Sequence, residues 1–531
     1  MGIKKGLPLV VVVSLFAASF SFAGNKNRPV FKPDLVITID STGNGFYADD
    51  TTNNSAAIQA AIDSCYNAGG GTVRFMNGTF LTGPFQLMSN VTLEIDSSAT
   101  LLATQNMQDY YPAGYPTNLP PSSSLEPLIT SDDADSLTIT GGGTIDGNGQ
   151  PWWDAVNTAK ALGQPSPSRP RLIQLNHSTN ILIENVTLKN SPQFHVSLEY
   201  CWNVTVKDVT ILAPSDSPNT DGIDPATCHN VHITGCRIDN GDDDIAIKSG
   251  RFDPTNPTAG CSNIVISDCT FLHGHGVSIG SETSGGVDSM TVDSCTFDST
   301  DNGLRIKSYR GNGGNVRGVT YSNITMNNVE YPIWISGYYP DIPSQTDPAK
   351  AVTATTPDYH DISIMNLTST GSPYAGLVIG LPEEPIEHLV LKNVNIAARF
   401  GLQIRNASID TADMQMSVSV GAPYVFQVGG VLTEVKSKAD GSPVTGYRLL
   451  QNYPNPFNPT TAISYQLSTI GRVTLRVYDV LGRRVATLVD GKQEPGNYSV
   501  TFNGSGLASG VYFYRLTAGI YTSTNKFVLM K

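Results

Sequence analysis

The chain is poor in charged residues, and above all in basic ones. Charged side chains make up 15% of its 531 residues, and 46 acidic residues outnumber 33 basic ones, which gives a formal net charge of −13 and a pI near 5.0. A chain this acidic has no broad basic face for nucleic acid. A polyanionic ligand would need a local patch of Lys and Arg that acts against the overall charge.

The sequence also lacks any Cys-x-x-Cys pair, which argues against a zinc or dithiol redox site. We predict no metal and no cofactor. Seven cysteines are present: Cys65, Cys201, Cys228, Cys236, Cys261, Cys269 and Cys295. The number is odd, so at least one cysteine is free. The sequence does not decide whether cysteines within residues 201–295 form disulfides.

Beyond the N-terminus, no segment is apolar enough to span a membrane. Residues 1–23 combine Lys4 and Lys5 with an apolar stretch that ends at Phe22 and Ala23. This pattern is typical of a secretory signal peptide, and a membrane anchor is the alternative. We therefore expect a mature protein that leaves the cytoplasm and is secreted or held at the cell surface.

Helical periodicity is scarce, whereas Gly and Pro number 50 and 33. A unit of the form Asn-apolar-x-apolar recurs at intervals of roughly 23 to 33 residues, which is typical of a solenoid. Its clearest copies begin at Asn180, Asn203, Asn230, Asn263 and Ser289. Each copy holds a second short apolar run, so the repeat predicts an all-β parallel β-helix.

The ends of the repeat region differ from its middle. Residues 53–65 show helical spacing and predict a helix that caps the N-terminal end. After about residue 430 the repeat stops, and alternating strands predict a small β-sandwich at 447–531. We predict a catalytic β-helix at 24–430 and a linker at 431–446. Cys236, Cys269 and Cys295 occupy equivalent places in successive units, which favours packing inside the core.

Aligning the second apolar runs on Ile223, Ile245, Val277, Leu304 and Ile333 predicts a polar stripe across five coils. The stripe residues stand two places earlier: Asp221, Asp243, His275, Asn302 and Tyr331. Adjacent coils lie ~4.8 Å apart, so these side chains should be neighbours. Strict strand alternation would turn them inward, so the prediction requires a turn or bulge at Gly222, Asp244 and Gly276.

The stripe suits glycosidic cleavage, which needs one protonated carboxyl and one ionised carboxylate. Asp242 lies beside Asp243, and crowding among Asp221, Asp242 and Asp243 should raise the pKa of at least one of them. Each signal is weak by itself, since an Asp run is more often a solvated turn or a calcium ligand. Their convergence on one stripe, next to Arg305 and Lys307, favours the catalytic interpretation.

Four ordered motifs then stand out: Asn219-Thr220-Asp221, Gly241-Asp242-Asp243, Gly274-His275-Gly276 and Arg305-Ile306-Lys307. From about residue 43 to residue 406 the chain resembles the polygalacturonases of glycoside hydrolase family 28. The resemblance implies a right-handed, pectin-lyase-like β-helix and inverting hydrolysis of α-1,4-galacturonosyl linkages in pectin. Rhamnogalacturonan hydrolases of the family tend to lack the full set of motifs, so homogalacturonan is the implied substrate.

The same resemblance implies a role for each site residue. Asp242 would be the general acid, Asp221 and Asp243 would hold the attacking water, and His275 would support the protonation of the acid. Arg305, Lys307 and Tyr331 would bind the galacturonate. Asp244 departs from the family pattern, because many relatives carry a non-acidic residue there.

The last 80 or so residues resemble the C-terminal sorting domain of cargo of the type IX secretion system. The implied partners are therefore that secretion machinery and the pectic polysaccharide, with a monomer as the expected state. A calcium-dependent pectate lyase and a non-enzymatic adhesin are the alternatives. Inserts at 152–171 and 337–357 bear on endo against exo action, which the sequence leaves open.

Overall fold

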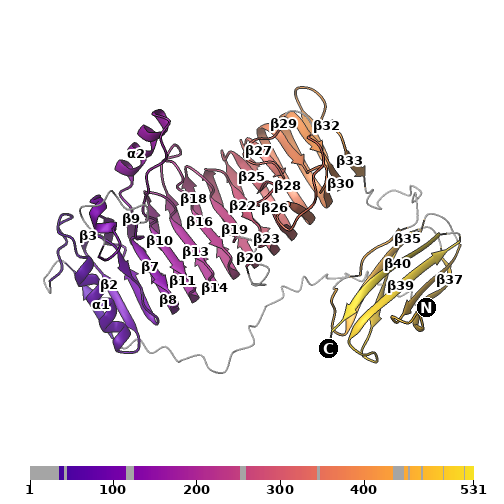
Figure 1. Ribbon diagram of the computed structural model, residues 1–531, viewed down its shortest axis with the longest axis horizontal. Helices are drawn as coiled ribbons and strands as arrows, with labels where there is room; N and C mark the ends of the chain where they lie inside the picture. The colour runs from indigo at the N-terminus through magenta and orange to yellow at the C-terminus, as the bar shows by residue number, and fades with distance from the viewer. Residues whose placement is uncertain are drawn as a thin grey trace, which may run out of the picture. The chain divides into compact units, whose positions relative to one another are not determined.

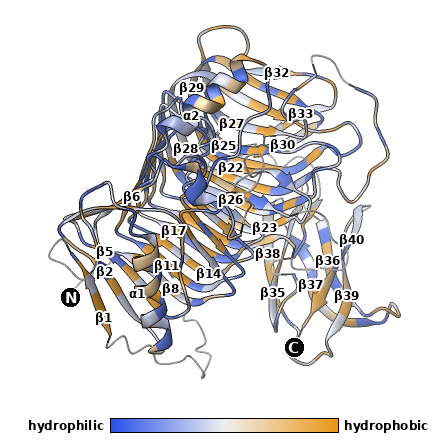
Figure 2. Cartoon of the chain, turned by 60° about the vertical axis from the view of Figure 1, so that its left-hand side comes forward, coloured by the Kyte–Doolittle hydropathy of each residue, from blue (hydrophilic) through white to orange (hydrophobic). Residues whose placement is uncertain are grey.

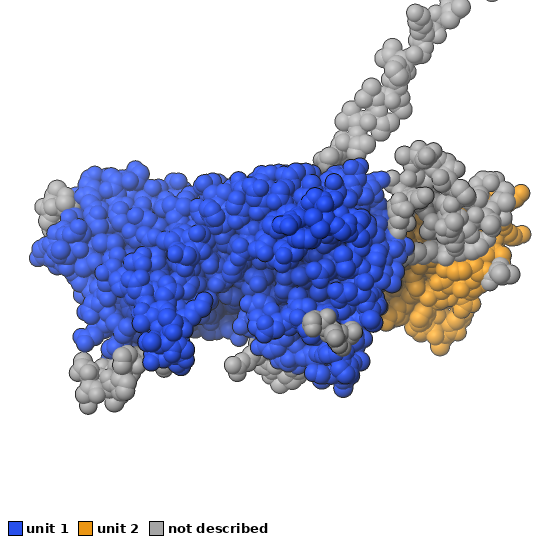
Figure 3. Space-filling model, turned by 90° about the horizontal axis from the view of Figure 1, so that it is seen from above, with its two compact units in different colours: residues 1–435 blue, residues 436–531 orange. Residues whose placement is uncertain are grey.

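The computed structural model describes residues 35–40, 45–114, 125–250, 259–343, 347–434, 448–452, 455–467, 471–493, 496–519 and 521–530. The chain divides into two units, residues 1–435 and 436–531, which Figure 3 colours separately. The predicted signal peptide lies outside the described residues, as does most of the predicted linker.

The first unit is a parallel solenoid in which each coil contributes strands to three columns (Figure 1). The first column contains β1 (Val36–Ile39), β2 (Gly71–Phe75), β5 (Val91–Ile95), β8 (Asp135–Thr140), β11 (Thr179–Glu184), β14 (Trp202–Lys207), β17 (His229–Thr234), β20 (Cys261–Ser267), β23 (Val287–Asp293), β26 (Asn315–Asn327), β28 (Asp358–Ile379), β29 (Ile386–Arg405), β30 (Ala407–Ala412) and β33 (Gly430–Glu434). The strand pairs in the described part of this unit are parallel, with register shifts in only a few of them, which confirms the predicted parallel β-helix.

The other two columns complete each coil, and the long strands β26, β28 and β29 bend from one column into the next. The second column contains β3 (Gly78–Thr82), β6 (Ala99–Ala103), β9 (Thr144–Asp146), β12 (Thr187–Lys189), β15 (Thr210–Leu212), β18 (Arg237–Asn240), β21 (Thr270–His273), β24 (Thr296–Asp298) and β31 (Gln415–Val418). The third contains β4 (Phe85–Gln86), β7 (Ile129–Asp132), β10 (Ile173–Asn176), β13 (Val196–Glu199), β16 (Ile223–Ala226), β19 (Ile245–Ser249), β22 (Val277–Thr283), β25 (Asn302–Lys307), β27 (Tyr331–Ser336) and β32 (Tyr424–Phe426). The third column carries the candidate site.

One continuous hydrophobic core fills the solenoid from Ile39 to Ile409. Alternate residues of each strand point into it, and hydrophobic residues accordingly recur along the strands in Figure 2. The three stacked cysteines, Cys236, Cys269 and Cys295, are each about 1% exposed, and all seven cysteines of the chain are free thiols. Core packing is therefore confirmed, and none of the disulfides that the sequence left open forms.

The structure explains why each repeat opens with asparagine. Asn180, Asn203, Asn230 and Asn263 all have φ near +56°, a left-handed turn conformation that Asn tolerates better than most residues. Their side chains also bond to one another from coil to coil, with Nδ2 to Oδ1 distances of 3.2, 3.0 and 2.8 Å. The sequence repeat is thus a ladder of turns on the outside of the solenoid.

In the described part of the chain, three helical segments accompany the strands. The helix α1 (Ser55–Asn67) buries Ile58, Ala61, Ile62 and Cys65 against the first coil, which confirms the predicted cap. A second helix, α2 (Gln150–Ala161), projects beside β9 and β10 in Figure 1, and a 3₁₀ turn, η1, spans Met107–Tyr110. Among the described residues, no helix combines the length and apolarity that crossing a bilayer requires.

The second unit consists of two antiparallel sheets around a separate core. The first sheet contains β34 (Arg448–Leu449), β35 (Thr460–Leu467) and β38 (Gly496–Asn503). The second contains β37 (Arg484–Gln493), β36 (Gly471–Tyr478), β39 (Gly510–Ala518) and β40 (Tyr521–Leu529). Residues of both sheets, among them Ile463, Leu475, Tyr514 and Phe527, share this core. The predicted β-sandwich is confirmed.

Candidate active site

The predicted register of the stripe is confirmed. Strand pairing places Ile223 beside Ile245, Ile245 beside Val277, Val277 beside Leu304 and Leu304 beside Ile333. The five stripe residues, Asp221, Asp243, His275, Asn302 and Tyr331, therefore follow one another on successive coils.

A turn before the strands resolves the conflict with strand alternation. The strands β16, β19 and β22 begin at the register residues, so Asp221, Asp243 and His275 precede them and are free of the inward and outward alternation. Gly276 has φ +71°, and a Cβ there would lie 2.0 Å from the carbonyl oxygen of Asn302. Only glycine fits this turn.

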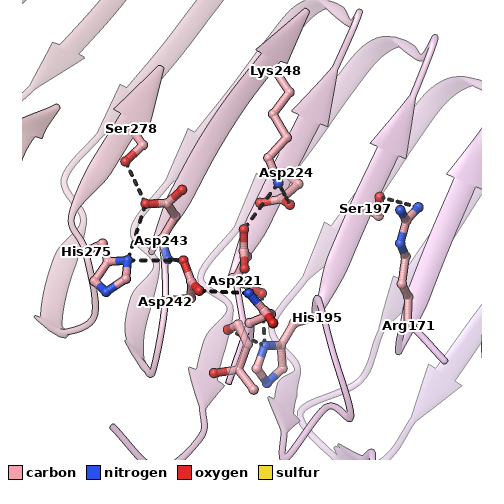
Figure 4. Close-up of polar contacts among 12 residues, drawn as sticks. Arg171, His195, Ser197, Asp221, Asp224, Asp242, Asp243, Lys248, His275 and Ser278 are labelled. Carbon is pink, nitrogen blue, oxygen red and sulfur yellow. Dashed lines mark hydrogen bonds and ion pairs between the residues drawn. The ribbon is translucent and has the colours of Figure 1, made fainter. Parts of the chain in front are cut away.

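Asp242 is the most accessible of the clustered aspartates, with a side chain that is 21% exposed. Its Oδ1 accepts the Asp243 N–H at 2.9 Å and lies 3.1 Å from His275 Nδ1, while Asn219 Nδ2 donates to its Oδ2 at 3.2 Å. Figure 4 shows Asp242 between the imidazole and the Asp221 region. Three donors thus hold one carboxyl group at the surface of the cluster.

His275 is a cation in this arrangement. Its Nε2 lies 3.3 Å from Asp301 Oδ2, opposite the contact with Asp242. Burial disfavours the charged ring, but the contacts with Asp242 and Asp301 outweigh burial and raise the pKa of His275 to about 10. The imidazolium therefore donates from both ring nitrogens.

Asp243 is buried and ionised, with a side chain that is 3% exposed. Its Oδ2 accepts from Lys307 Nζ at 2.7 Å, and its Oδ1 accepts from Arg305 Nη1 at 3.2 Å and from Ser278 Oγ at 2.7 Å. Burial opposes ionisation, yet the charges of Lys307 and Arg305 outweigh it and hold the pKa of Asp243 well below its usual range. The two cations that the sequence assigned to substrate thus also neutralise a carboxylate of the protein.

Asp221 belongs to a second cluster, one coil before Asp243. Lys248 Nζ lies 3.2 Å from Asp221 Oδ2 and 2.5 Å from Asp224 Oδ2. Burial and the neighbouring charge of Asp224 raise the pKa of Asp221 well above its ordinary value, and Lys248 opposes that shift. Asp221 Oδ1 is buried without a hydrogen-bond partner among the described residues, so it has an acceptor to offer to water.

The charges around the Asp run disfavour a shared cation site. Oxygens of Asp242 and Asp243 lie within 4.8 Å of a His275 nitrogen, but that ring carries a proton and Asp243 already binds two cations. Asp244 is fully buried and points elsewhere, to the Gly276 N–H at 2.9 Å. The positive charges would repel a calcium ion, which speaks against the calcium-dependent lyase.

Tyr331 lies at the C-terminal side of these clusters. Its ring stacks on Tyr374 with centroids 4.6 Å apart, and Tyr374 in turn stacks on Phe400 at 5.4 Å. Burial raises the pKa of Tyr331 to about 12, so the phenol stays neutral. The described contacts of the Tyr331 ring are aromatic, whereas Arg305 and Lys307 contact the Asp243 carboxylate.

The sequence interpretation missed Asp224, Lys248 and Ser278. Asp224 and Ser278 hold the position one residue after the register residue, as Arg305 does, so the alignment that found Arg305 had the signal for them. The alignment gave no such indication for Lys248. Its backbone lies away from the stripe, and its Nζ contacts Asp221 only because the side chain is long.

Two family models match the chain. Residues 73–418 match "Glycosyl hydrolases family 28", and residues 451–530 match "Secretion system C-terminal sorting domain". The first match covers well over half of the chain and all of the clustered site. The second covers the β-sandwich unit and indicates a bacterial protein that is secreted or held at the cell surface through the type IX machinery.

Known polygalacturonases resemble most of the chain. The endo-polygalacturonase of Pectobacterium carotovorum subsp. carotovorum is 36% identical over 419 residues, which span 75% of this chain and 96% of the relative. The crystal structure of the polygalacturonase from Erwinia carotovora ssp. carotovora matches with a TM-score of 0.57 and 31% identity, over 78% of this chain and 100% of that one. A Yersinia enterocolitica family 28 exopolygalacturonase shares the fold, with a TM-score of 0.62, 24% identity and coverage of 78% and 79%. The chain therefore belongs to glycosyl hydrolase family 28, as a secreted or surface-held bacterial enzyme with polygalacturonase activity on pectin.

Proposed function

We propose that the enzyme cleaves homogalacturonan with inversion, and that Asp242 donates the proton to the leaving glycosidic oxygen. The observation that carries the proposal is the contrast between two adjacent carboxyls. Asp242 is partly exposed, whereas Asp243 is buried against Lys307 and Arg305 and is held ionised. Glycosidases require such a separation of a proton donor from an anion.

His275 acts once the proton has been transferred. Its Nδ1 lies 3.1 Å from Asp242 Oδ1, and the ionised Asp242 is among the contacts that raise the pKa of His275 to about 10. Once Asp242 has given up its proton, the imidazolium stabilises the carboxylate that remains. Asn219 orients the other oxygen of Asp242.

Asp221 and Asp243 share the attacking water in this proposal. We place the water between Asp243 and Asp221, because Oδ1 of Asp221 has no hydrogen-bond partner among the described residues. Asp243 supplies a fixed negative charge, and Asp221, which has the higher pKa, accepts the proton.

Arg305, Lys307 and Tyr331 would bind the galacturonosyl unit on the C-terminal side. The side chain of Arg305 is 12% exposed and that of Lys307 is 6% exposed, so Arg305 has more surface to offer to a carboxylate. Its planar guanidinium also suits a carboxylate better than an ammonium does. The ring of Tyr331 extends this surface by one coil.

Asp242→Asn tests the assignment, because it removes the proton donor at nearly constant volume. Turnover of polygalacturonate should disappear while urea unfolding stays as in the wild type, and Asp239→Asn on β18 should remain active. A variant that keeps more than about a tenth of the wild-type rate would show that Asp242 is not the acid. The anomer of the first product, followed by NMR, tests the stereochemistry, and a retained configuration would refute inversion.

A further inference from the structure

The segment that follows β27, residues 337–343, packs on the outer face of the third column. We call it the strap. It forms a hydrophobic cluster, separate from the solenoid core, that contains Trp334, Tyr338, Tyr339, Ile342, Leu377, Ile379 and Leu381. Trp334 pairs with Arg305, and Leu377 pairs with Trp334. The strap therefore covers the two coils that come directly after Arg305 in the same row.

Two arginines from other coils fix Tyr338 of the strap. Tyr338 is 7% exposed, and the guanidinium carbons of Arg310 and Arg405 each lie 5.4 Å from the centroid of its ring. Its hydroxyl donates to the Asp347 carboxylate, to which Arg310 Nη1 also donates at 2.5 Å. Arg310 further binds Glu383 through Nε at 2.5 Å and through Nη2 at 2.9 Å. We call Tyr338, Asp347, Arg310 and Glu383 the clamp, because they tie the strap to the chain between β28 and β29.

The next residue of the strap, Tyr339, lies beside the two cations of the site. Lys307 Nζ is 5.2 Å from the centroid of the Tyr339 ring, and the guanidinium carbon of Arg305 is 5.7 Å from it. The same guanidinium carbon is 5.4 Å from the ring of Trp334. Separations below about 6 Å are those of cation–π attraction. Arg305 is thus held by two aromatic rings as well as by Asp243, to which its Nη1 donates at 3.2 Å.

The aromatic contacts matter because Arg305 lies next to a carboxylate of the protein itself. A guanidinium that is free to turn would bind Asp243 through two N–H groups, which is the stronger geometry. Within the described part of the chain, Arg305 bonds to Asp243 through Nη1, and its buried Nε has no hydrogen-bond partner. Donors therefore remain for an anion of the substrate. A guanidinium that is already oriented also loses less freedom when that anion binds.

We propose that Tyr339 is a positioning residue of this enzyme. Its ring orients the Arg305 guanidinium toward a carboxylate of the substrate, and the clamp holds the ring in place. The inference rests on the proposed function, because it takes Arg305 as the group that binds the galacturonosyl carboxylate. Arg310 then affects substrate binding from outside the site, through the strap. The aromatic face of Tyr339 carries this role, and its hydroxyl has no part in it.

Steady-state kinetics on polygalacturonate test the proposal with four single variants. Tyr339→Leu removes the aromatic face but keeps an apolar side chain, so KM should rise about tenfold while kcat stays within about twofold of the wild type. Tyr339→Phe keeps the face and should behave as the wild type. Arg310→Gln breaks the clamp and should raise KM as Tyr339→Leu does. Its matched control is Arg317→Gln on β26, an arginine paired with Asp288 at 2.8 Å, which should leave KM unchanged.

Two double variants test the route by which these residues act. Adding Tyr339→Leu to Arg305→Gln should raise KM no further, and a further tenfold rise would overturn the proposal by showing that the ring contacts the sugar itself. Adding Arg310→Gln to Tyr339→Leu should also raise KM no further, and losses that multiply would overturn the role of the clamp.

The single variants at position 339 decide the positioning role by themselves. Tyr339 is only partly buried, so these variants should fold even where Arg310→Gln does not. An unchanged KM with Tyr339→Leu would overturn the proposal, and so would a loss of binding that persists in Tyr339→Phe. Failure of the proposed function looks different, because Arg305→Gln alone would then keep the wild-type KM.

Discussion

Asp244→Asn is expected to stabilise the solenoid at neutral pH and to have no effect in acid. Asp244 is fully buried, its Oδ2 accepts the Gly276 N–H at 2.9 Å, and its Oδ1 has no partner among the described residues. Burial raises the pKa of Asp244 well above its ordinary value, and the Gly276 N–H offsets only part of that shift. Asparagine has nearly the same shape, keeps the acceptor and never ionises.

The sign of the pH dependence follows from the raised pKa. An unfolded Asp ionises near pH 3.9, whereas the folded protein still holds the proton there. The unfolding free energy of the wild type therefore falls as pH rises above that value, by up to about 1.4 kcal/mol per pH unit for one proton, until the folded pKa is reached. Asp244→Asn lacks this loss. Its advantage should be near zero below about pH 3.9 and should then grow with the same slope.

Urea unfolding at a series of pH values measures this difference. The four tryptophans of the chain, Trp152, Trp153, Trp202 and Trp334, all lie in residues 1–435, so their fluorescence reports on the solenoid alone. Asp216→Asn, at an exposed position, is the control and should show no pH-dependent difference. The reasoning would be refuted if Asp244→Asn were less stable than the wild type at pH 7, or if its advantage did not change with pH.

Three further predictions concern the site and the second unit. Lys307→Met should lower the free energy of unfolding by on the order of 3 kcal/mol, because the buried charge of Asp243 then lacks one of its two cations. It should also slow turnover of charged and of methyl-esterified pectin alike. A loss of activity confined to the charged polymer would assign Lys307 to substrate binding alone. Asp224→Asn removes a like charge that raises the pKa of Asp221, so the acid limb of the pH–rate profile should move to lower pH, and an unchanged limb would contradict that coupling. Deleting residues 447–531 should leave kcat/KM of the purified enzyme unchanged while blocking export in the native host. A loss of activity in the purified enzyme would contradict the view that the two units fold and work independently.

The sequence by itself determined the solenoid and the composition of its polar stripe. An apolar pattern that repeats coil after coil permits only one register, because a slip of one residue would turn the buried aliphatics of every strand outward. Ile223, Ile245 and Val277 therefore pair as aligned, and the stripe residues two places earlier follow from that pairing. Cys236 and its equivalents obey the same rule, and so their core position was predictable.

Only the tertiary structure determined which charged side chains contact one another. Asp243 contacts Arg305 and Lys307, more than 60 residues later in the chain, and Lys248 reaches back one coil to Asp221. Strand register determines which residues lie side by side on successive coils. The turns before the strands and the lengths of the side chains determine where the charged atoms lie. The pKa values depend on those distances and on burial, so the lowered pKa of Asp243 and the raised pKa of Asp244 appear only once the coils are stacked.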